Sequence, residues 1–186
     1  MFGDPQRSAV IAYTSVFIGL IAVGGWISIP FIPVPLTLQT FFVLLAGTVM
    51  KRLAVIPAAL YILCGALSLP VFHNGTAGIG VLLGPTGGYI VGFVPAALVV
   101  GIAYEGPGAF RRIAGLVLGT ALIYACGVAW LCLSAGLPPG MAVILGVLPF
   151  LPGDVLKIVA VYTIADRLQS RRSSGKQESG GGQSHD

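Results

Sequence analysis

The stretch PFLPGDVLKIV, residues 149–159, places two charged side chains, Asp154 and Lys157, in a run of the chain that is otherwise apolar or small. Its two prolines and its glycine interrupt a regular helix. The two charges lie three residues apart, so on a helix that starts after this break they share one face. The rest of the sequence decides what surrounds them.

The composition identifies a membrane protein. The chain of 186 residues is 56% hydrophobic and 9% charged, and its mean hydropathy is +0.95, whereas a soluble domain carries about 25% charged residues. No Asp, Glu, Lys or Arg occurs in residues 8–50, 53–104 or 113–153. Each of these gaps is much longer than the roughly 20 apolar residues that cross a bilayer, so each holds more than one crossing.

Turn-forming residues divide the gaps into six predicted spans. The runs IPFIPVP (29–35) and LPPG (137–140) predict turns, and the Gly-rich residues 73–88 predict a loop. The spans are expected near residues 9–28, 36–50, 53–72, 89–104, 113–135 and 141–166. Two pairs of small residues, Gly88 with Gly92 and Gly115 with Gly119, predict helices that approach closely.

The basic residues predict the orientation of these spans. Cytoplasmic loops are rich in Lys and Arg, and here every second connection is basic while the others contain neither residue. The basic residues that define this pattern are Arg7, Lys51, Arg52, Arg111, Arg112, Arg167, Arg171, Arg172 and Lys176. The sequence therefore predicts an all-α integral membrane bundle of six transmembrane helices with cytoplasmic N and C termini.

The chain is expected to form one transmembrane domain, residues 1–168, followed by a cytoplasmic tail. Residues 169–186 are polar and rich in Gly and Ser, which predicts disorder. The net charge of +4 reflects the cytoplasmic loops. No nucleic-acid partner is expected, because no basic patch is interleaved with exposed aromatic residues.

Charged residues within a span predict a functional site. Asp and Lys each cost about 2.5 to 3.5 kcal/mol at the centre of a membrane helix, although a salt bridge that only joins helices is the structural alternative. Pro149, Pro152 and Gly153 break the helix beside them, and irregular backbone at membrane depth lines a cavity or is buried in protein. Freed amides near Gly153 and Asp154 are expected to point into that cavity.

Other polar residues are predicted on the same side of the membrane. Counted from Asp166, Asp154 lies about 18 Å up the helix, past the midplane toward the outside. Thr37, Gln39 and Thr40 begin the second span, and His73, Asn74 and Thr76 lie in the outer Gly-rich loop. We expect a pocket that opens outward and suits a small amphipathic solute. The threonines could instead bond to their own helix, and Asn74-Gly75 could serve only as a turn.

Three motifs together resemble one family. IPVPLTLQTFFVLLAG (32–47), LSLPVFHNGTAGIGVLLGPTGGYIVGF (67–93) and LPFLPGDVLKIV (148–159) are similar, in this order, to the BioY family. Its members are the biotin-binding S-components of energy-coupling-factor (ECF) vitamin transporters. The resemblance covers roughly residues 9–168. It implies a six-helix protein in the plasma membrane of a bacterium or archaeon that captures biotin from outside with high affinity.

The resemblance also implies partners and ligand-binding residues. The S-component is expected to work with one transmembrane coupling protein and two cytoplasmic ATPases. This chain has no G-x-x-x-x-G-K-[ST] motif, so it is not expected to be an enzyme. The hydrolysis of ATP is therefore expected in the partner subunits. No cofactor and no metal is expected. By the family pattern, the polar ligands of biotin would be Asp154 and Lys157. Gln39, Thr37, Asn74 and Tyr89 are the next candidates.

Two features depart from the family pattern. Small residues commonly follow PVF, whereas His73 and Asn74 follow it here. The coupling face is associated with Ala-x-x-x-Ala in the first span, where the nearest small pairs of this chain are Ser8 with Ala12 and Ser15 with Gly19.

Alternative functions are weighed against this resemblance. An S-component for another small vitamin and a solitary proton-coupled carrier remain open, although carriers usually show internal repeats and no second PGD-like break occurs. An intramembrane aspartyl protease needs two aspartates that share a proton, and Asp154 has no such partner in the spans.

Overall fold

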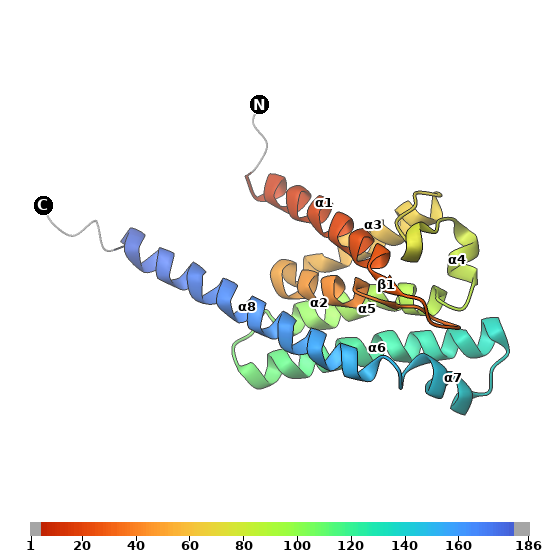
Figure 1. Cartoon of the computed structure of the whole chain (residues 1–186). Helices are drawn as coiled ribbons and strands as arrows, with labels where there is room; N and C mark the ends of the chain where they lie inside the picture. The colour runs from red at the N-terminus through yellow and green to blue at the C-terminus, as the bar shows by residue number, and fades with distance from the viewer. Residues whose placement is uncertain (1–4, 181–186) are drawn as a thin grey trace, which may run out of the picture.

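The computed structural model describes residues 5–180 of the chain and the side chains of residues 6–170. It consists almost entirely of helices that run back and forth beside one another (Figure 1). The helix α1 begins and the helix α8 ends on the same side of the molecule. The all-α fold predicted from the charge-free gaps is confirmed.

The helices occupy most of the predicted spans. They are α1 (Pro5–Trp26), α2 (Gln39–Met50), α3 (Val55–Ala66), α4 (Ile79–Leu83), α5 (Gly87–Ala103), α6 (Ala109–Ala135), α7 (Pro139–Gly146) and α8 (Leu151–Gly180), with the 3-10 turns η1 (Lys51–Ala54) and η2 (His73–Gly75). The prolines of residues 29–35 end α1 and delay the start of α2. Within this segment, β1 (Ser28–Ile29) and β2 (Leu36–Thr37) pair antiparallel, a small hairpin that was not predicted.

The chain reverses direction between α2 and α3. Gln39, at the start of α2, hydrogen-bonds Tyr61 in α3, although 22 residues of straight helix would separate them by about 33 Å. The reversal occurs at Lys51, whose φ is 56°. The predicted cytoplasmic turn at Lys51 and Arg52 is therefore present, and the 28-residue helical segment Gln39–Ala66 is not one straight span.

By length and hydropathy alone, three helices in the described part of the chain qualify as membrane spans, or four with the bent pair α7–α8. Gly87–Ala103 is a shorter apolar helix. The chain is a helical membrane protein, and the count of six crossings stays a prediction.

The helix α5 lies at the centre and packs mainly against α6, with further contacts to α2 and α3. The predicted small pairs lie on this interface. A Cβ on Gly92 would meet Ile123 of α6 at 3.1 Å, and one on Gly119 would meet the Ala96 carbonyl of α5 at 3.3 Å. Glycine therefore brings the two backbones together as the spacing predicted.

The last span is broken where Pro149 and Pro152 predict it. The segments Pro139–Gly146 and Leu151–Ser170 meet at a bend of 55°. The amide expected to be freed at Asp154 is not free, because it donates to the Phe150 carbonyl at 2.9 Å. The backbone turns tightly enough to satisfy this donor inside the first turn of α8.

Two segments are more helical than predicted. Residues 79–83 form α4 within the predicted loop, since the apolar residues between Gly78 and Gly84 pack as one short turn of helix. The helix α8 continues to Gly180, where the sequence predicts a disordered tail after residue 168; residues 181–186 of that tail lie outside the described residues. Half of residues 169–180 are Arg, Gln, Lys or Glu, which are good helix formers, and they extend a helix that is already nucleated.

Candidate functional site

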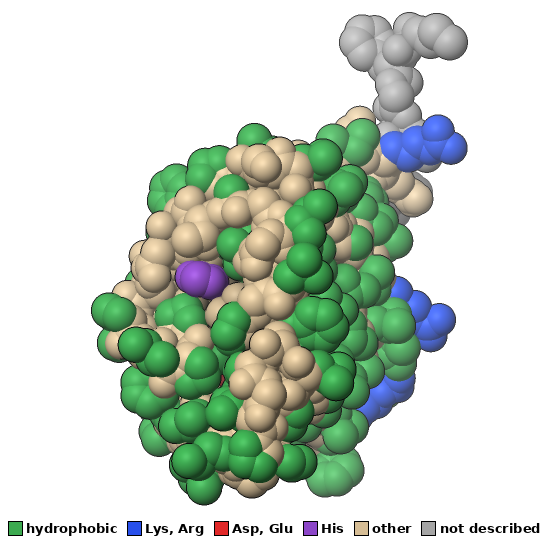
Figure 2. Space-filling view, turned by 90° about the vertical axis from the view of Figure 1, so that its right-hand side faces the viewer, with side chains coloured by type: hydrophobic (Ala, Val, Ile, Leu, Met, Phe, Trp, Pro, Cys, Tyr) green, Lys and Arg blue, Asp and Glu red, His purple; other side chains and the backbone are tan. Residues whose placement is uncertain are grey.

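A cavity lies at the end of the bundle away from the basic loops. The space between its lining side chains measures about 480 Å³ with the part open to solvent included, of which about 40 Å³ is accessible to the centres of water-sized molecules. Figure 2 shows this end, with a histidine side chain (purple) in its surface and Lys and Arg side chains only at the margin of the view. The lining comes from the hairpin segment, α2, η2, α5, α6 and α8: Val34, Pro35, Thr37, Gln39, Thr40, His73, Thr86, Tyr89, Ile90, Phe93, Ile123, Tyr124, Phe150, Asp154 and Lys157.

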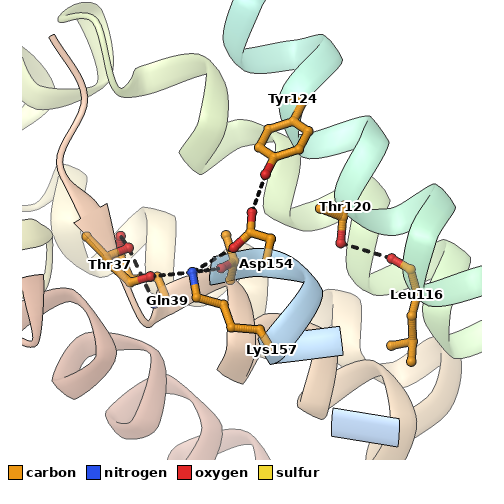
Figure 3. Close-up of polar contacts among 8 residues, drawn as sticks. Thr37, Gln39, Leu116, Thr120, Tyr124, Asp154 and Lys157 are labelled. Carbon is orange, nitrogen blue, oxygen red and sulfur yellow. Dashed lines mark hydrogen bonds and ion pairs between the residues drawn. The ribbon is translucent and has the colours of Figure 1, made fainter. Parts of the chain in front are cut away.

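The charged pair of α8 lies in this lining. Lys157 Nζ is 2.7 Å from Asp154 Oδ1. The side chains are only 15% and 7% exposed, respectively. Lys157 also donates to the Thr37 carbonyl at 2.7 Å and to Thr40 Oγ1 at 2.9 Å, both next to the start of α2 (Figure 3). An ammonium has three donor hydrogens, so the protein already satisfies all of them.

The second oxygen of Asp154 accepts a hydrogen bond from Tyr124 of α6 (Figure 3). Each carboxylate oxygen offers about two lone pairs, so one protein bond to each leaves acceptor capacity on both. Asp154 can therefore accept further N–H donors, whereas Lys157 must release a present partner before it can donate to a ligand. Position 124 was not predicted, although a tyrosine within an apolar span is a visible signal.

The amide of Gln39 is held by two hydroxyl groups. Its nitrogen donates to the Tyr61 hydroxyl, which in turn donates to the Val71 carbonyl at 3.0 Å. Its oxygen accepts from Thr37 Oγ1 at 3.1 Å. Gln39 is 4% exposed, so this chain of bonds fixes a buried carboxamide at the cavity wall.

Aromatic rings form the apolar wall on the side of the helix break. Tyr89 stacks on Phe150 with ring centroids 6.5 Å apart, and its hydroxyl donates to the Gly146 carbonyl at 2.9 Å. That bond satisfies the last carbonyl of α7, which the break leaves without a helical partner. Tyr89 thus joins α5 to the broken span and presents its ring face to the cavity.

The outer loop closes one side of the cavity mouth. Trp26 Nε1 donates to the Pro70 carbonyl at 3.1 Å, and Ser28 donates to Asn74. His73 Nε2 lies 3.4 Å from Thr86 Oγ1 at the start of α5. Burial lowers the pKa of His73 below its usual value, because the partly enclosed position disfavours the charged ring.

The structure brings together most of the predicted site residues. Asp154, Lys157, Gln39, Thr37 and Tyr89 line the cavity. Asn74 does not, since its side chain bonds to Ser28 of the hairpin, and it adopts a left-handed φ of 54° as a turn residue does. The lining residues Thr86, Ile123, Tyr124 and Phe150 were not predicted.

These groups together suit a neutral or anionic solute with N–H donors and an apolar body. A buried acceptor with spare lone pairs lies beside a fixed cation and a fixed carboxamide, and aromatic and aliphatic walls surround them. Such a mixture of a few oriented polar groups on apolar walls is typical of small-molecule sites.

Several known proteins are similar to this chain in sequence or in fold. The chain is 42% identical over 165 residues to a probable biotin transporter BioY of Pyrococcus horikoshii, which covers 88% of this chain and 98% of the relative. It is 44% identical over 156 residues to the biotin transporter BioY of Thermotoga maritima, with 83% and 92% covered. The crystal structure of an S-component for biotin from an ECF-type ABC transporter superposes with a TM-score of 0.80 at 25% identity, covering 91% of this chain and 95% of that one.

The family match extends over nearly the whole described fold, from the start of α1 into the C-terminal half of α8. Residues 4–174 match the BioY family. The three motifs singled out in the sequence fall within this range and supply most of the polar cavity lining. The chain belongs to the BioY family.

Proposed function

We propose that this chain captures biotin from the extracellular side of the plasma membrane and is the S-component of an ATP-driven ECF transporter. The observation that carries the proposal is the Asp154 carboxylate, which is buried at the cavity wall and keeps acceptor capacity on both oxygens. The ureido ring of biotin offers two N–H donors, and a carboxylate can accept both.

The other cavity groups have complementary roles in this proposal. Gln39 and Thr37 offer a carboxamide and a hydroxyl to the ureido oxygen and nitrogens, while Phe93, Phe150 and Tyr89 enclose the sulfur-containing ring and the aliphatic chain. Lys157 acts mainly by holding Asp154 in position, since its own donors are occupied. Asn74 contributes indirectly, through the loop that it anchors to Ser28.

The partners are part of the proposal. A multi-pass chain whose basic loops face the cytoplasm would present biotin to one transmembrane coupling protein, with ATP hydrolysed by two separate subunits. The chain is proposed to consist of one transmembrane domain, residues 1–168, with the extension of α8 beyond it on the cytoplasmic side.

Two measurements test this function. Isothermal titration of the purified protein should give a dissociation constant on the order of nanomolar for biotin, and mass spectrometry of the purified protein should find biotin bound. Absence of both heat and a thermal shift with biotin would remove the proposal, and tight binding of a different vitamin would redirect it. Uptake by liposomes that contain this chain alone and a proton gradient would favour a solitary carrier instead of an ECF subunit.

A further inference from the structure

His73 lies at the cavity mouth with one ring nitrogen unused. The residue belongs to η2 and lines the cavity beside Thr86 of α5. Its Nδ1 atom is buried and has no hydrogen-bond partner among the described residues. Polar atoms buried in this way are rare in native proteins and call for an explanation such as a missing ligand.

The contacts of the ring indicate when Nδ1 carries a proton. Thr86 Oγ1 lies 3.4 Å from His73 Nε2 and also donates to the Val81 carbonyl at 3.4 Å. Because the Thr86 hydroxyl has only one proton, its contact with Nε2 is satisfied when Nε2 carries a proton of its own. Nδ1 then gains a proton in the imidazolium form, which an anion at the cavity mouth favours.

The ligand proposed above has one group that the inner wall does not accommodate. If Asp154 and Gln39 hold the ureido ring, the aliphatic chain extends toward the mouth and ends in a carboxylate. Lys157 does not provide its counter-charge, because Thr37, Thr40 and Asp154 already take its three donors. Asn74 is unavailable as well, since its side chain bonds to Ser28.

Resting on the proposed function, we infer that His73 is a specificity-determining residue whose Nδ1–H donates to the terminal carboxylate of the ligand. The site would therefore prefer the free acid to a neutral ester or amide of the same vitamin. The loop contacts of Trp26 with Pro70 and of Ser28 with Asn74 hold the segment that carries the ring at the mouth.

If His73 contacts the ligand carboxylate, the affinity for the acid should depend on pH. The other titratable groups that line the same cavity are Asp154 and Lys157 of α8, Tyr89 of α5 and Tyr124 of α6. A ligand carboxylate raises the pKa of His73 relative to the empty site, so binding of the acid takes up a proton. Affinity for the acid should rise as pH falls from 7 toward 5.5, and affinity for the methyl ester should not.

The test compares biotin with biotin methyl ester on three proteins. His73→Phe keeps an aromatic ring without a nitrogen, and His73→Asn keeps an N–H donor near the position of Nδ1. In the unaltered protein the acid should bind at least tenfold tighter than the ester. His73→Phe should reduce this ratio to about one and remove the pH dependence, while His73→Asn should keep most of the ratio.

The outcomes separate this inference from the function on which it rests. If the unaltered protein binds neither compound, the proposed function fails. If it binds biotin but His73→Phe keeps both the acid-to-ester ratio and the pH dependence, the role of His73 fails while the function stands. Equal melting temperatures of the unliganded proteins exclude misfolding as the cause of a lost ratio.

Discussion

Lys157 of α8 donates to the backbone carbonyl of Thr37, 120 positions earlier, across a distance of 2.7 Å. The same ammonium holds Asp154 Oδ1 at 2.7 Å. The charged pair is therefore not only a bond within one helix, because it ties the broken last span to the segment that starts α2. A ligand that binds Asp154 changes the electrostatic environment of this tie, which connects two helices of the bundle.

The first prediction concerns the stability of the pair. Lys157→Met leaves Asp154 as a buried charge whose remaining described partner is Tyr124, and loss of one member of a buried pair costs about 3 to 5 kcal/mol. The double substitution Asp154→Asn with Lys157→Met removes both charges and should recover most of that loss. Thermal unfolding in detergent, without biotin, gives the melting temperatures of the unaltered protein, Lys157→Met and the double variant.

The double variant decides between two causes of the lower stability expected for Lys157→Met. If it unfolds as readily as Lys157→Met alone, the stranded charge is not the problem, and the lost tie to Thr37 and Thr40 accounts for the instability. Both variants should bind biotin more weakly, by about 2 kcal/mol or more, because both disturb the arrangement at Asp154 on which the proposed site depends.

The sequence predicts the pair but not its long-range partners. Residues 149–159 stand out because a charge within an apolar run is costly and prolines beside it break a helix. The same reasoning yields the helices, since charge-free gaps and basic turns are local signals. The contacts of Lys157 with Thr37 and of Asp154 with Tyr124 depend on how three distant helices pack, and no local pattern records that.

In the outer loop, the sequence alone likewise does not determine which side chain faces the cavity. Asn74 was a reasonable candidate because it is polar and lies beside the predicted pocket. Its backbone adopts the left-handed conformation of a turn, which directs its side chain to Ser28 and leaves His73 at the cavity. Sequence reasoning placed the loop correctly near the mouth, but which of two adjacent side chains faces inward depends on a single φ angle.

The second prediction tests Asp154 as the acceptor for biotin. Asp154→Asn removes the charge that accepts the ureido N–H groups and should weaken binding by about 2 to 5 kcal/mol, measured by calorimetry. Glu105→Gln is the matched control, because it neutralises a carboxylate in the exposed ion pair with Arg52, 2.8 Å away at the basic end of the molecule. The control should leave affinity unchanged and alter stability by at most about 1 kcal/mol. Equal dissociation constants for Asp154→Asn and the unaltered protein would place Asp154 outside the ligand contacts.

The third prediction separates the orientation of Asp154 from its charge. Tyr124→Phe removes the hydroxyl that bonds to the second carboxylate oxygen and should destabilise the protein by about 1.5 to 3 kcal/mol, the range for hydrogen bonds to charged groups. Biotin binding should weaken less than in Asp154→Asn. In a double-mutant cycle, Tyr124→Phe should cost much less when position 154 is already Asn. Additive effects would show that the two side chains act independently.

The last prediction concerns the space that Tyr89 occupies. A Cβ at Gly127 of α6 would run into the Tyr89 ring, which is 8% exposed, stacked on Phe150 and bonded to the Gly146 carbonyl. Gly127→Ala therefore forces the ring toward the cavity or away from α7, and such overpacking typically costs about 1 to 3 kcal/mol. We expect a lower melting temperature together with weaker biotin binding, even though alanine favours the helix.

Gly19→Ala in α1 provides the matched control for that substitution. A Cβ at Gly19 meets nothing within 4 Å, so alanine should stabilise the helix by about 0.5 to 1 kcal/mol and leave biotin affinity unchanged. Calorimetry measures the biotin affinity of Gly127→Ala and Gly19→Ala, and thermal unfolding measures their melting temperatures. Unaltered affinity in Gly127→Ala would mean that the Tyr89 ring can shift without narrowing the site, and the wall formed by Tyr89 and Phe150 would then not define the shape of the ligand.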